Sequence, residues 1–432
     1  MGIRRPAIGP HVVSNTIETS WGKTPHRLLS LDEAHSRIAE QVTPLPSETV
    51  SLEQAAGCVL AAPIVASEDD PAFDKAMMDG FAVRAVDCAQ PTTQLEVVGL
   101  VPAGAESTRT VGSGQAVQIN TGAAVPDGAD AVVRIEDTTH AADAAHVTIN
   151  VPVSAGRNIA PRAGNSRKGD VVLAAPLRLE SAQIAAAATV GAAKVDVYPQ
   201  ITVAIAVTGN ELVTVGQEKR PGQIFESNGP MLAALMRQFG AMPKQIGIVP
   251  DDPQALTRSL AGALQHPLVV TVGGMSMGTL DLVPQAFSDL GVDWKFHGVH
   301  MRPGKPVAYG RGPNGQHVFG LPGNPVSAFV CAWLFVRMVI RGLQGLPPSP
   351  PQRWTATLAQ DLKPARDGRI SLLPARVWNR TDSGMMAELC DWRGSGDPVG
   401  LARANALLIR DNPTEAVPAG RRAQVILIAS DI

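Results

Sequence analysis

The feature that most restricts the fold is an alternation of strands and helices between about residues 201 and 345. An uninterrupted apolar run such as ITVAIAV (201–207) is typical of a strand covered on both faces of a parallel sheet. Segments with helical periodicity separate such runs, and this alternation predicts a doubly wound α/β domain. The expected elements are strands at 201–207, 244–249 and 267–272, helices at 231–239, after Asp252 and at 281–290, and a long apolar helix after LPGNP (321–325).

The flanking regions follow other patterns. From about 91 to 176, short runs of alternating apolar and polar residues predict a small β module. Ser30 and Glu33 have the spacing of a capping box at the start of a helix, whereas residues 67–85 are expected to form a loop. The predicted division is a flexible tail (1–26), an N-terminal linker region with the inserted β module (27–200), the α/β domain (201–345), a Pro-rich linker (346–351) and a C-terminal β-barrel-like domain (352–432).

The composition is typical of a globular protein and does not indicate a surface on which charges of one sign predominate. Apolar residues make up 45% of the 432 residues, charged residues 18%, and the net charge at pH 7 is −2. This balance gives no basis for a nucleic-acid or membrane surface. The four widely spaced cysteines predict buried thiols in a reducing compartment, and the first residues lack the apolar run of a signal peptide. We therefore expect a soluble, cytoplasmic protein.

Four loops are predicted at the carboxyl ends of the parallel strands, which is where open α/β sheets bind ligands. One glycine-rich loop alone is more often a plain turn, but four at one edge favour a ligand site. Backbone N–H groups at Gly273, Gly274 and Gly278, with the hydroxyl of Ser276, suit an anion such as a phosphate. The loops are VTGNEL (207–212), VPDDP (249–253), TVGGMSMGTLD (271–281) and GLPGNPVSA (320–328).

Charged residues recur in and near these loops. Glu211, Asp251 and Asp281 are carboxylates that suit Mg²⁺, which commonly takes one or two of them together with phosphate oxygens and water. Arg302 and Lys305, in MRPGKP (301–306), are cations on a Pro-bounded loop and suit an oxyanion.

Other common sites are disfavoured by spacing. Gly304-Lys305 is followed by Pro306, so there is no P-loop, and GGMSMG does not match the dinucleotide fingerprint. His297 and His300 stand three residues apart, but no third metal ligand lies near them in the sequence, which argues against a zinc site.

Together these segments resemble the MoeA family, which includes the gephyrin E domain. The resemblance spans roughly residues 27–430, and its motifs occur in family order. They are FDKAMMDGFAVR (73–84), NTGAAVPDGADAVV (120–133), VTGNEL, GGMSMGTLD (273–281), MRPGKP and GLPGNPVSAF (320–329).

The resemblance implies a multidomain homodimer with a MogA-like central α/β domain. It also implies Mg²⁺-dependent cleavage of adenylyl-molybdopterin, driven by molybdate, which yields molybdenum cofactor and AMP. Contact with a molybdopterin adenylyltransferase is a further implied partnership. The positions that match the family's functional residues are Asp79 and Thr121, the acidic Glu211, Asp251 and Asp281, Ser276 of the phosphate loop, Arg302 and Lys305, Pro322 and Pro325, and Arg376 and Ser395, which are tied to molybdate.

Three positions depart from the family pattern. Asn165 and Asn210 stand where Asp is common, and Gly298 where some members have Lys. Two other functions stay open on the sequence alone. One is a MogA-like molybdopterin adenylyltransferase, against which the extra residues carrying Asp79 and Thr121 argue. The other is a non-catalytic scaffold that binds molybdopterin, which would not need the acidic and cationic loops.

Overall fold

The structure, a computed structural model, describes residues 16–17, 26–105, 109–140, 145–275, 282–364, 368–381, 384–411 and 415–429. The chain divides into two compact units. The first unit comprises residues 1–46 and 198–432, and the second comprises 47–197. Most of the predicted tail lies outside the described residues, but Thr16–Ile17 (β1) pairs with His26–Arg27 (β2).

The helix predicted after the capping box is present as α1 (Leu31–Ala39), with Ser30 and Glu33 satisfying each other's backbone N–H groups. The division at residue 27 had grouped this helix with the N-terminal region. Its buried face, including Leu31 and Ile38, instead packs into the core of the first unit, against the last helix of the α/β domain.

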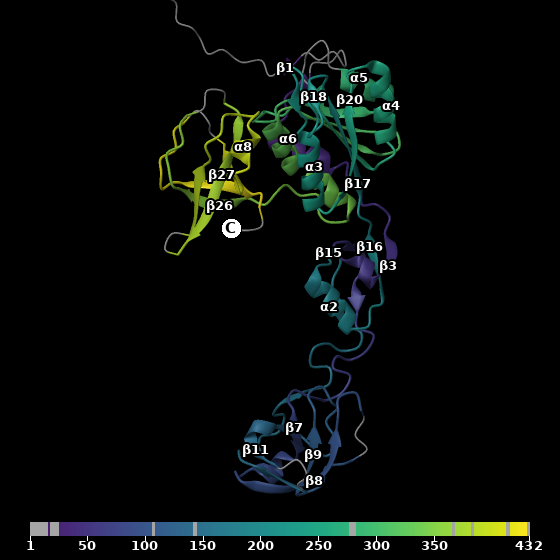
Figure 1. The fold of residues 1–432 in the computed structure, drawn as a ribbon, viewed down its shortest axis with the longest axis vertical. Helices are drawn as coiled ribbons and strands as arrows, with labels where there is room; N and C mark the ends of the chain where they lie inside the picture. Colours follow the sequence, from purple (N-terminus) through teal and green to yellow (C-terminus); the bar gives the residue numbers. More distant parts are fainter. Residues whose placement is uncertain are drawn as a thin grey trace, which may run out of the picture. The chain divides into compact units, whose positions relative to one another are not determined.

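The α/β domain of the first unit is built on a six-stranded sheet with helices on both faces (Figure 1). Side chains alternate along β17, so that Val203 and Ile205 pack with α3 and the apolar C-terminal helices, whereas Ala204 and Ala206 pack with α4 and α5. This confirms the doubly wound prediction. In sheet order the strands are β20 (Met242–Val249), β17 (Thr202–Thr208), β21 (Leu268–Val272), β25 (His317–Leu321), β24 (Ala308–Arg311) and β22 (Asp293–His297). The first four are mutually parallel, and β24 runs antiparallel to both of its neighbours, β25 and β22.

The helices follow the predicted order with shifted ends. Asp252 caps α4 through the N–H of Ala255, and Pro253 occupies the first turn. The helix α3 begins at Asn228, three residues before the predicted start. The helices are α3 (Asn228–Gln238), α4 (Pro253–Ala263), α5 (Leu282–Asp289), α6 (Pro325–Cys331) and α7 (Arg337–Leu343), the last two joined by a π-helical turn, Ala332–Val336.

The stretch Pro325–Leu343 is long and apolar enough to cross a membrane, but 83% of its most apolar window is buried within the protein. It forms part of the largest apolar core, in which Val330, Phe335 and Ile340 pack against the sheet and α3. Burial of this kind is typical of a core helix.

The C-terminal domain of the first unit is a closed β-barrel, as expected. Closure follows because β27 pairs with both β28 and β29, which are joined in turn through β26 and β30. A sixth strand, β23 (Met301–Arg302), comes from the MRPGKP loop of the α/β domain and pairs parallel to β27. The barrel strands are β26 (Trp354–Leu358), β27 (Ile370–Arg380), β28 (Gly384–Leu389), β29 (Ala406–Arg410) and β30 (Arg422–Leu427), with a short helix α8 (Pro398–Leu401).

The second unit contains the predicted β module, with one correction. Residues 80–83 lie within the segment expected to be a loop, but they form β7, a strand between β10 and β9. Gly80 is required there because a Cβ atom would overlap the carbonyl oxygen of Val133 on β10. The sheet order is β10 (Ala131–Arg134), β7 (Gly80–Val83), β9 (Gln115–Ile119), β8 (Thr93–Val101), β12 (His146–Ile149) and β11 (Thr138–Thr139).

The remainder of the second unit forms small sheets. The segment 170–173 had been assigned to the β module, but its strand β14 (Val171–Leu173) pairs instead with β5 (Ile64–Val65). The helix α2 (Ser181–Thr189) ends before Gly191, whose positive φ of +77° terminates it. The other strands are β3 (Glu48–Ser51), β4 (Val59–Leu60), β15 (Leu177–Arg178) and β16 (Lys194–Tyr198), which form one sheet, and β6 (Lys75–Ala76) paired with β13 (Ile159–Ala160).

Candidate active site at the carboxyl edge of the α/β sheet

A cavity of about 700 Å³ lies where the four predicted loops meet at the carboxyl ends of β17, β20, β21 and β25. Every one of these strands sends a loop into its wall because parallel strands end at the same edge of the sheet. The structure thereby brings together six residues singled out in the sequence, namely Glu211, Asp251, Gly273, Gly274, Pro322 and Pro325. The predicted site residues Ser276, Gly278 and Asp281 lie outside the described residues.

The wall formed by Gly273 and Gly274 cannot accept side chains. Both residues have positive φ, +89° and +60°, and a Cβ at Gly273 would overlap the carbonyl oxygen of Thr208. A Cβ at Gly274 would lie 2.6 Å from a methyl carbon of Val283. The main chain of this loop therefore borders the cavity directly, as an anion-binding loop requires.

Two buried polar atoms beside the cavity have no hydrogen-bond partner among the described residues. They are Oγ1 of Thr208 and Oδ1 of Asn228, on side chains that are 4% and 7% exposed. The other amide atom of Asn228, Nδ2, donates to the carbonyl oxygen of Gly323 at 2.8 Å. The sequence analysis missed both residues. Asn228 could have been noticed as a polar residue at the start of α3, directly after a strand that leaves the predicted site.

The acidic part of the cavity consists of Glu211 and Asp251, which are both exposed and follow adjacent strands. The backbone N–H of Asp251 donates to Oδ1 of Asn210 at 3.2 Å, which ties the two loops together. In the described part of the chain no group of three His, Cys, Asp or Glu side chains could hold a metal. Two carboxylates that line one cavity still fit Mg²⁺, because this ion usually completes its shell with oxygens of a bound ligand and water.

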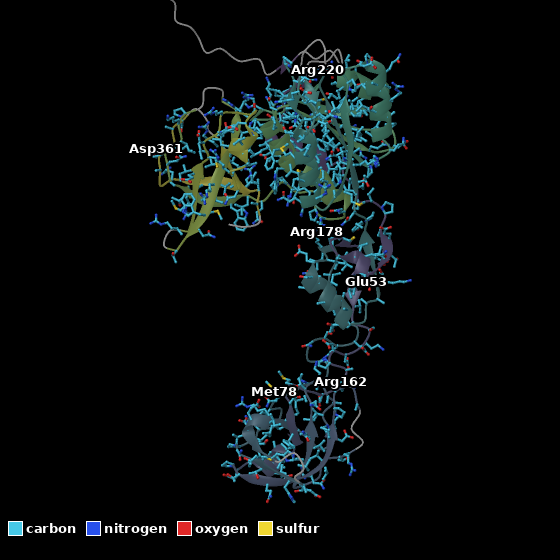
Figure 2. The ribbon with its side chains drawn as sticks, viewed as in Figure 1. Glu53, Met78, Arg162, Arg178, Arg220 and Asp361 are labelled. Atoms are coloured by element: carbon cyan, nitrogen blue, oxygen red, sulfur yellow. The ribbon has the colours of Figure 1, made fainter. Side chains whose placement is uncertain are left out.

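A second cavity, of about 510 Å³, is lined by cationic side chains. Arg302, predicted as an oxyanion ligand, lines it together with Lys363 and Arg410, which the sequence analysis missed. Arg410 donates from Nη1 to the carbonyl oxygen of Lys363, which links these two residues. Asp361, labelled in Figure 2, is the only carboxylate among the lining residues, so positive side chains outnumber it.

The two cavities share two chain segments. Residues 302–306 contribute Arg302 to the second cavity and Pro306 to the first. Likewise, residues 392–398 contribute Trp392 to the second and Pro398 to the first. The same two segments therefore contribute to the walls of both cavities.

The remaining predicted oxyanion residues occupy different places. Ser395 accepts a hydrogen bond at its Oγ from Nδ2 of Asn324, at 3.1 Å, in the segment that borders both cavities. Lys305 follows Gly304 in the shared loop and is half-buried, but it lines neither of the two cavities. Arg376 also lines neither; it is exposed on β27, paired across the strands with Glu388.

In the second unit, Asp79 and Thr121 lie together, although 42 residues separate them. The backbone N–H of Thr121 donates to Oδ1 of Asp79 at 2.7 Å, and Nδ2 of Asn120 donates to the same oxygen at 3.4 Å. These hydrogen bonds lower the pKa of Asp79, so it is ionised at neutral pH. Next to this carboxylate the side chains of Met77 and Met78 are exposed (Met78 is labelled in Figure 2).

The three departures from the family pattern have structural contexts. Gly298 has a φ of +94°, a conformation that a lysine would adopt only with strain. Asn165 donates to a carboxylate oxygen of Asp70 at 2.9 Å, a bond that an aspartate could not donate. Asn210 uses its oxygen as an acceptor, which an aspartate could also do.

A family model described as the MoeA N-terminal region (domain I and II) matches residues 29–191, and one described as a probable molybdopterin binding domain matches residues 204–342. A molybdopterin molybdenumtransferase of Staphylococcus epidermidis is 34% identical over 410 residues, which cover 93% of this chain and 96% of that protein. The chain belongs to the MoeA family. The resemblance inferred from the motifs is thus confirmed.

Further similar proteins agree in sequence or in fold. A molybdopterin molybdenumtransferase of Staphylococcus aureus is 35% identical over 414 residues, covering 93% of this chain and 96% of the relative. A solved MoeA protein from Pyrococcus horikoshii covers 94% of this chain and 100% of its own, with 29% identity and a TM-score of 0.75. A molybdenum cofactor biosynthesis protein from Pyrococcus furiosus, 22% identical over 93% of this chain with a TM-score of 0.56, shares the fold.

Proposed function

We propose that this MoeA-family chain is a molybdopterin molybdenumtransferase, which inserts molybdate into the dithiolene of adenylyl-molybdopterin and releases AMP. The observation that carries the proposal is the pair of cavities formed in part by the same two segments, one bordered by glycine backbone and carboxylates, the other by three cations. This arrangement offers separate places for a pyrophosphate-linked substrate and for an oxyanion. The full-length similarity to relatives that bear this name supports it.

The residues of the first cavity suit cleavage of the pyrophosphate. Glu211 and Asp251 would hold Mg²⁺, which neutralises charge on the phosphate oxygens when bound. The main chain at Gly273 and Gly274 approaches the substrate phosphate closely, since no side chain stands in the way. The dithiolene belongs to the substrate, so no cysteine needs to line this cavity.

The second cavity suits molybdate, a tetrahedral dianion. Arg302 presents a planar fork of donors that can bind two oxygens at once, and Lys363 and Arg410 add positive charge. The segments 302–306 and 392–398 then place the oxyanion beside the substrate. Fixed cations that need not reorganise lower the free energy of an anionic transition state.

Release of AMP from adenylyl-molybdopterin by the full chain tests this function. We expect release that requires both molybdate and Mg²⁺, and that falls by about 10²-fold or more in Asp251→Asn. Consumption of ATP and molybdopterin without any use of molybdate would identify the chain as a MogA-like adenylyltransferase instead. Tight binding of molybdopterin with no turnover of either kind would identify a scaffold.

We further propose that the chain acts as a cytoplasmic homodimer. In this dimer the loop of Asp79 and Thr121 contributes to the active site of the partner subunit. The hydrogen-bonded, ionised Asp79 next to exposed Met77 and Met78 supports a docking role for this loop. A molybdopterin adenylyltransferase is the natural donor partner, because it makes the substrate.

A further inference from the structure

One part of the first cavity is formed by large apolar side chains that remain exposed. Ile224 and Phe225 line the cavity with side chains that are 55% and 41% exposed. Large apolar side chains usually pack away from water, so an exposed aromatic ring at the mouth of a ligand cavity commonly has a ligand as its partner.

The strand that carries this ring is attached directly to the carboxylate loop. Two residues of β19 (Ile224–Phe225) pair parallel to β18 (Leu212–Val213), which follows Glu211. The N–H of Ile224 donates to the carbonyl oxygen of Glu211 at 2.8 Å. Ile224 is therefore hydrogen-bonded directly to Glu211, a residue suited to hold a phosphate-bound cation.

The far end of the strand is fixed as well. The N–H of Glu226 donates to the carbonyl oxygen of Val213 at 2.9 Å, and its carboxylate accepts from the N–H of Gly229 at 2.7 Å in α3. Glu226 is buried, so this connection is sheltered from water. Phe225 is consequently held between two anchored backbone positions, which reduces the entropy that a ligand would lose in ordering it.

One side of the ring is already occupied by a cation. Nζ of Lys219 lies 4.4 Å from the ring centroid of Phe225, at the distance of a cation–π contact. Lys219 and Arg220 belong to the loop between β18 and β19, which Arg220 marks in Figure 2. Although a cation contacts the ring, Phe225 remains 41% exposed, so part of it is accessible to a second planar group.

We propose that Phe225, flanked by Ile224, is the platform on which a nitrogen heterocycle of the substrate stacks. The inference rests on the proposed function, since adenylyl-molybdopterin carries two such heterocycles, adenine and pterin, each joined to a phosphate. Stacking against Phe225 orients the heterocycle while Glu211 and Asp251 serve the phosphates. Phe225 thus determines substrate affinity and takes no part in proton transfer.

Binding measurements on the full-length protein test the platform. AMP and molybdopterin are titrated separately by calorimetry into the wild type, Phe225→Leu and Phe225→Trp. Loss of the ring should weaken one of the two probes by about tenfold, as expected for one stacked heterocycle, and Trp should restore it. Weaker AMP binding identifies adenine as the stacked group, and weaker molybdopterin binding identifies the pterin. Unchanged affinity for both probes overturns the proposal.

A matched control is available on the same loop. Val215 is 63% exposed, carries no ring and does not line the cavity, so Val215→Ala should bind both probes like the wild type. An equal loss in Val215→Ala would mean that the loop as a whole, and not the ring, is responsible. In turnover, Phe225→Leu should raise KM about tenfold with little change in kcat. If the wild type releases no AMP from adenylyl-molybdopterin, the proposed function fails, while the binding comparison still decides the platform.

Discussion

At Arg302, substitution can separate the effect of the positive charge on oxyanion binding from the effect of the two-pronged hydrogen-bond geometry of the guanidinium. If its guanidinium binds molybdate through two hydrogen bonds, Arg302→Lys keeps the charge but loses the fork. We expect the molybdate concentration for half-maximal AMP release to rise about tenfold in Arg302→Lys, equivalent to about 1.4 kcal/mol, and further in Arg302→Ala. Arg258→Ala, an exposed arginine on α4 that lines neither cavity, is the control. Unchanged molybdate dependence in Arg302→Ala would remove this residue from the oxyanion site.

The sequence predicted the site residues that lie close to strand ends. Glu211, Asp251 and Gly273 lie within three residues of the carboxyl ends of parallel strands, and parallel topology alone brings such positions together. Lys363 and Arg410 were missed because they belong to the barrel and reach the second cavity only through its closure. Thr208 and Phe225 were missed because each looks like an ordinary strand residue, and only burial or exposure in the folded chain distinguishes them.

The strand β7 depends on one glycine. Because a Cβ at Gly80 would overlap the main chain of β10, Gly80→Ala must push the two strands apart. We expect a loss of about 2 kcal/mol or more in the stability of the second unit, seen as a lower melting temperature. Gly99→Ala on β8 of the same sheet is the control, since its Cβ would meet nothing closer than 3.7 Å. Equal melting temperatures for the two variants would contradict this packing.

The helix α1 contains a buried histidine, His35, whose protonation makes the stability of the protein depend on pH in the acidic range. The ring of His35 packs 5.4 Å from that of Phe335. Burial lowers the pKa of His35 to about 4; Arg353 lowers it further, whereas Asp32 and the main chain of Leu334 raise it, each by less than burial. Between pH 6.5 and 4 the unfolded chain therefore binds more protons, so stability falls as pH falls, by on the order of 3 kcal/mol.

His35→Leu removes this proton uptake and keeps an apolar contact with Phe335. We expect the variant's melting temperature to fall less than that of the wild type between pH 7 and pH 5. The buried His317, whose pKa is lowered to about 3 by burial and by Arg311, remains in both proteins and cancels in the comparison. Parallel pH profiles for the two proteins would show that His35 does not contribute.

Helices and strands were predicted correctly where the apolar periodicity was strong. The prediction failed where residues typical of turns occur within a strand. The capping box of α1 and the Asp252 cap of α4 appear as expected because both depend on local hydrogen bonds. The strand β7 was taken for a loop because Asp79-Gly80 looks like a turn, whereas the glycine is there for close strand packing. The last two strands of the sheet, β24 and the edge strand β22, were not predicted as strands, since a doubly wound pattern does not require antiparallel pairs.

For the whole molecule, mixing two inactive variants tests whether two protomers share each site. Asp79→Ala and Glu211→Ala should each be inactive as homodimers. After random exchange, half of the dimers are mixed and each has one intact site, so activity should recover to about a quarter of the wild-type value. If both residues act within one chain, every site retains a defect. Absence of recovery, with exchange verified by mass spectrometry, would therefore exclude sharing and leave the chemical roles intact.

The fold class was predictable from the sequence, but the assignment of each helix and strand to a domain was less predictable. Strand–helix alternation and the late run of strands predicted the α/β domain and the barrel. The division at residue 27 took no account of α1, whose apolar face could have packed against either neighbour. Long-range packing of this kind depends on surfaces that the chain forms only after both elements exist.

The strand β23 makes the C-terminal barrel inseparable from the domain that precedes it. Met301 and Arg302 are hydrogen-bonded into a sheet whose other strands begin about fifty residues later, beyond the Pro-rich linker. A chimera joined at that linker would combine a barrel from one parent with a strand from the other, and with it one wall of the cationic cavity. Recombination between relatives is therefore expected to preserve function only when the loop 301–306 and the final domain are inherited together.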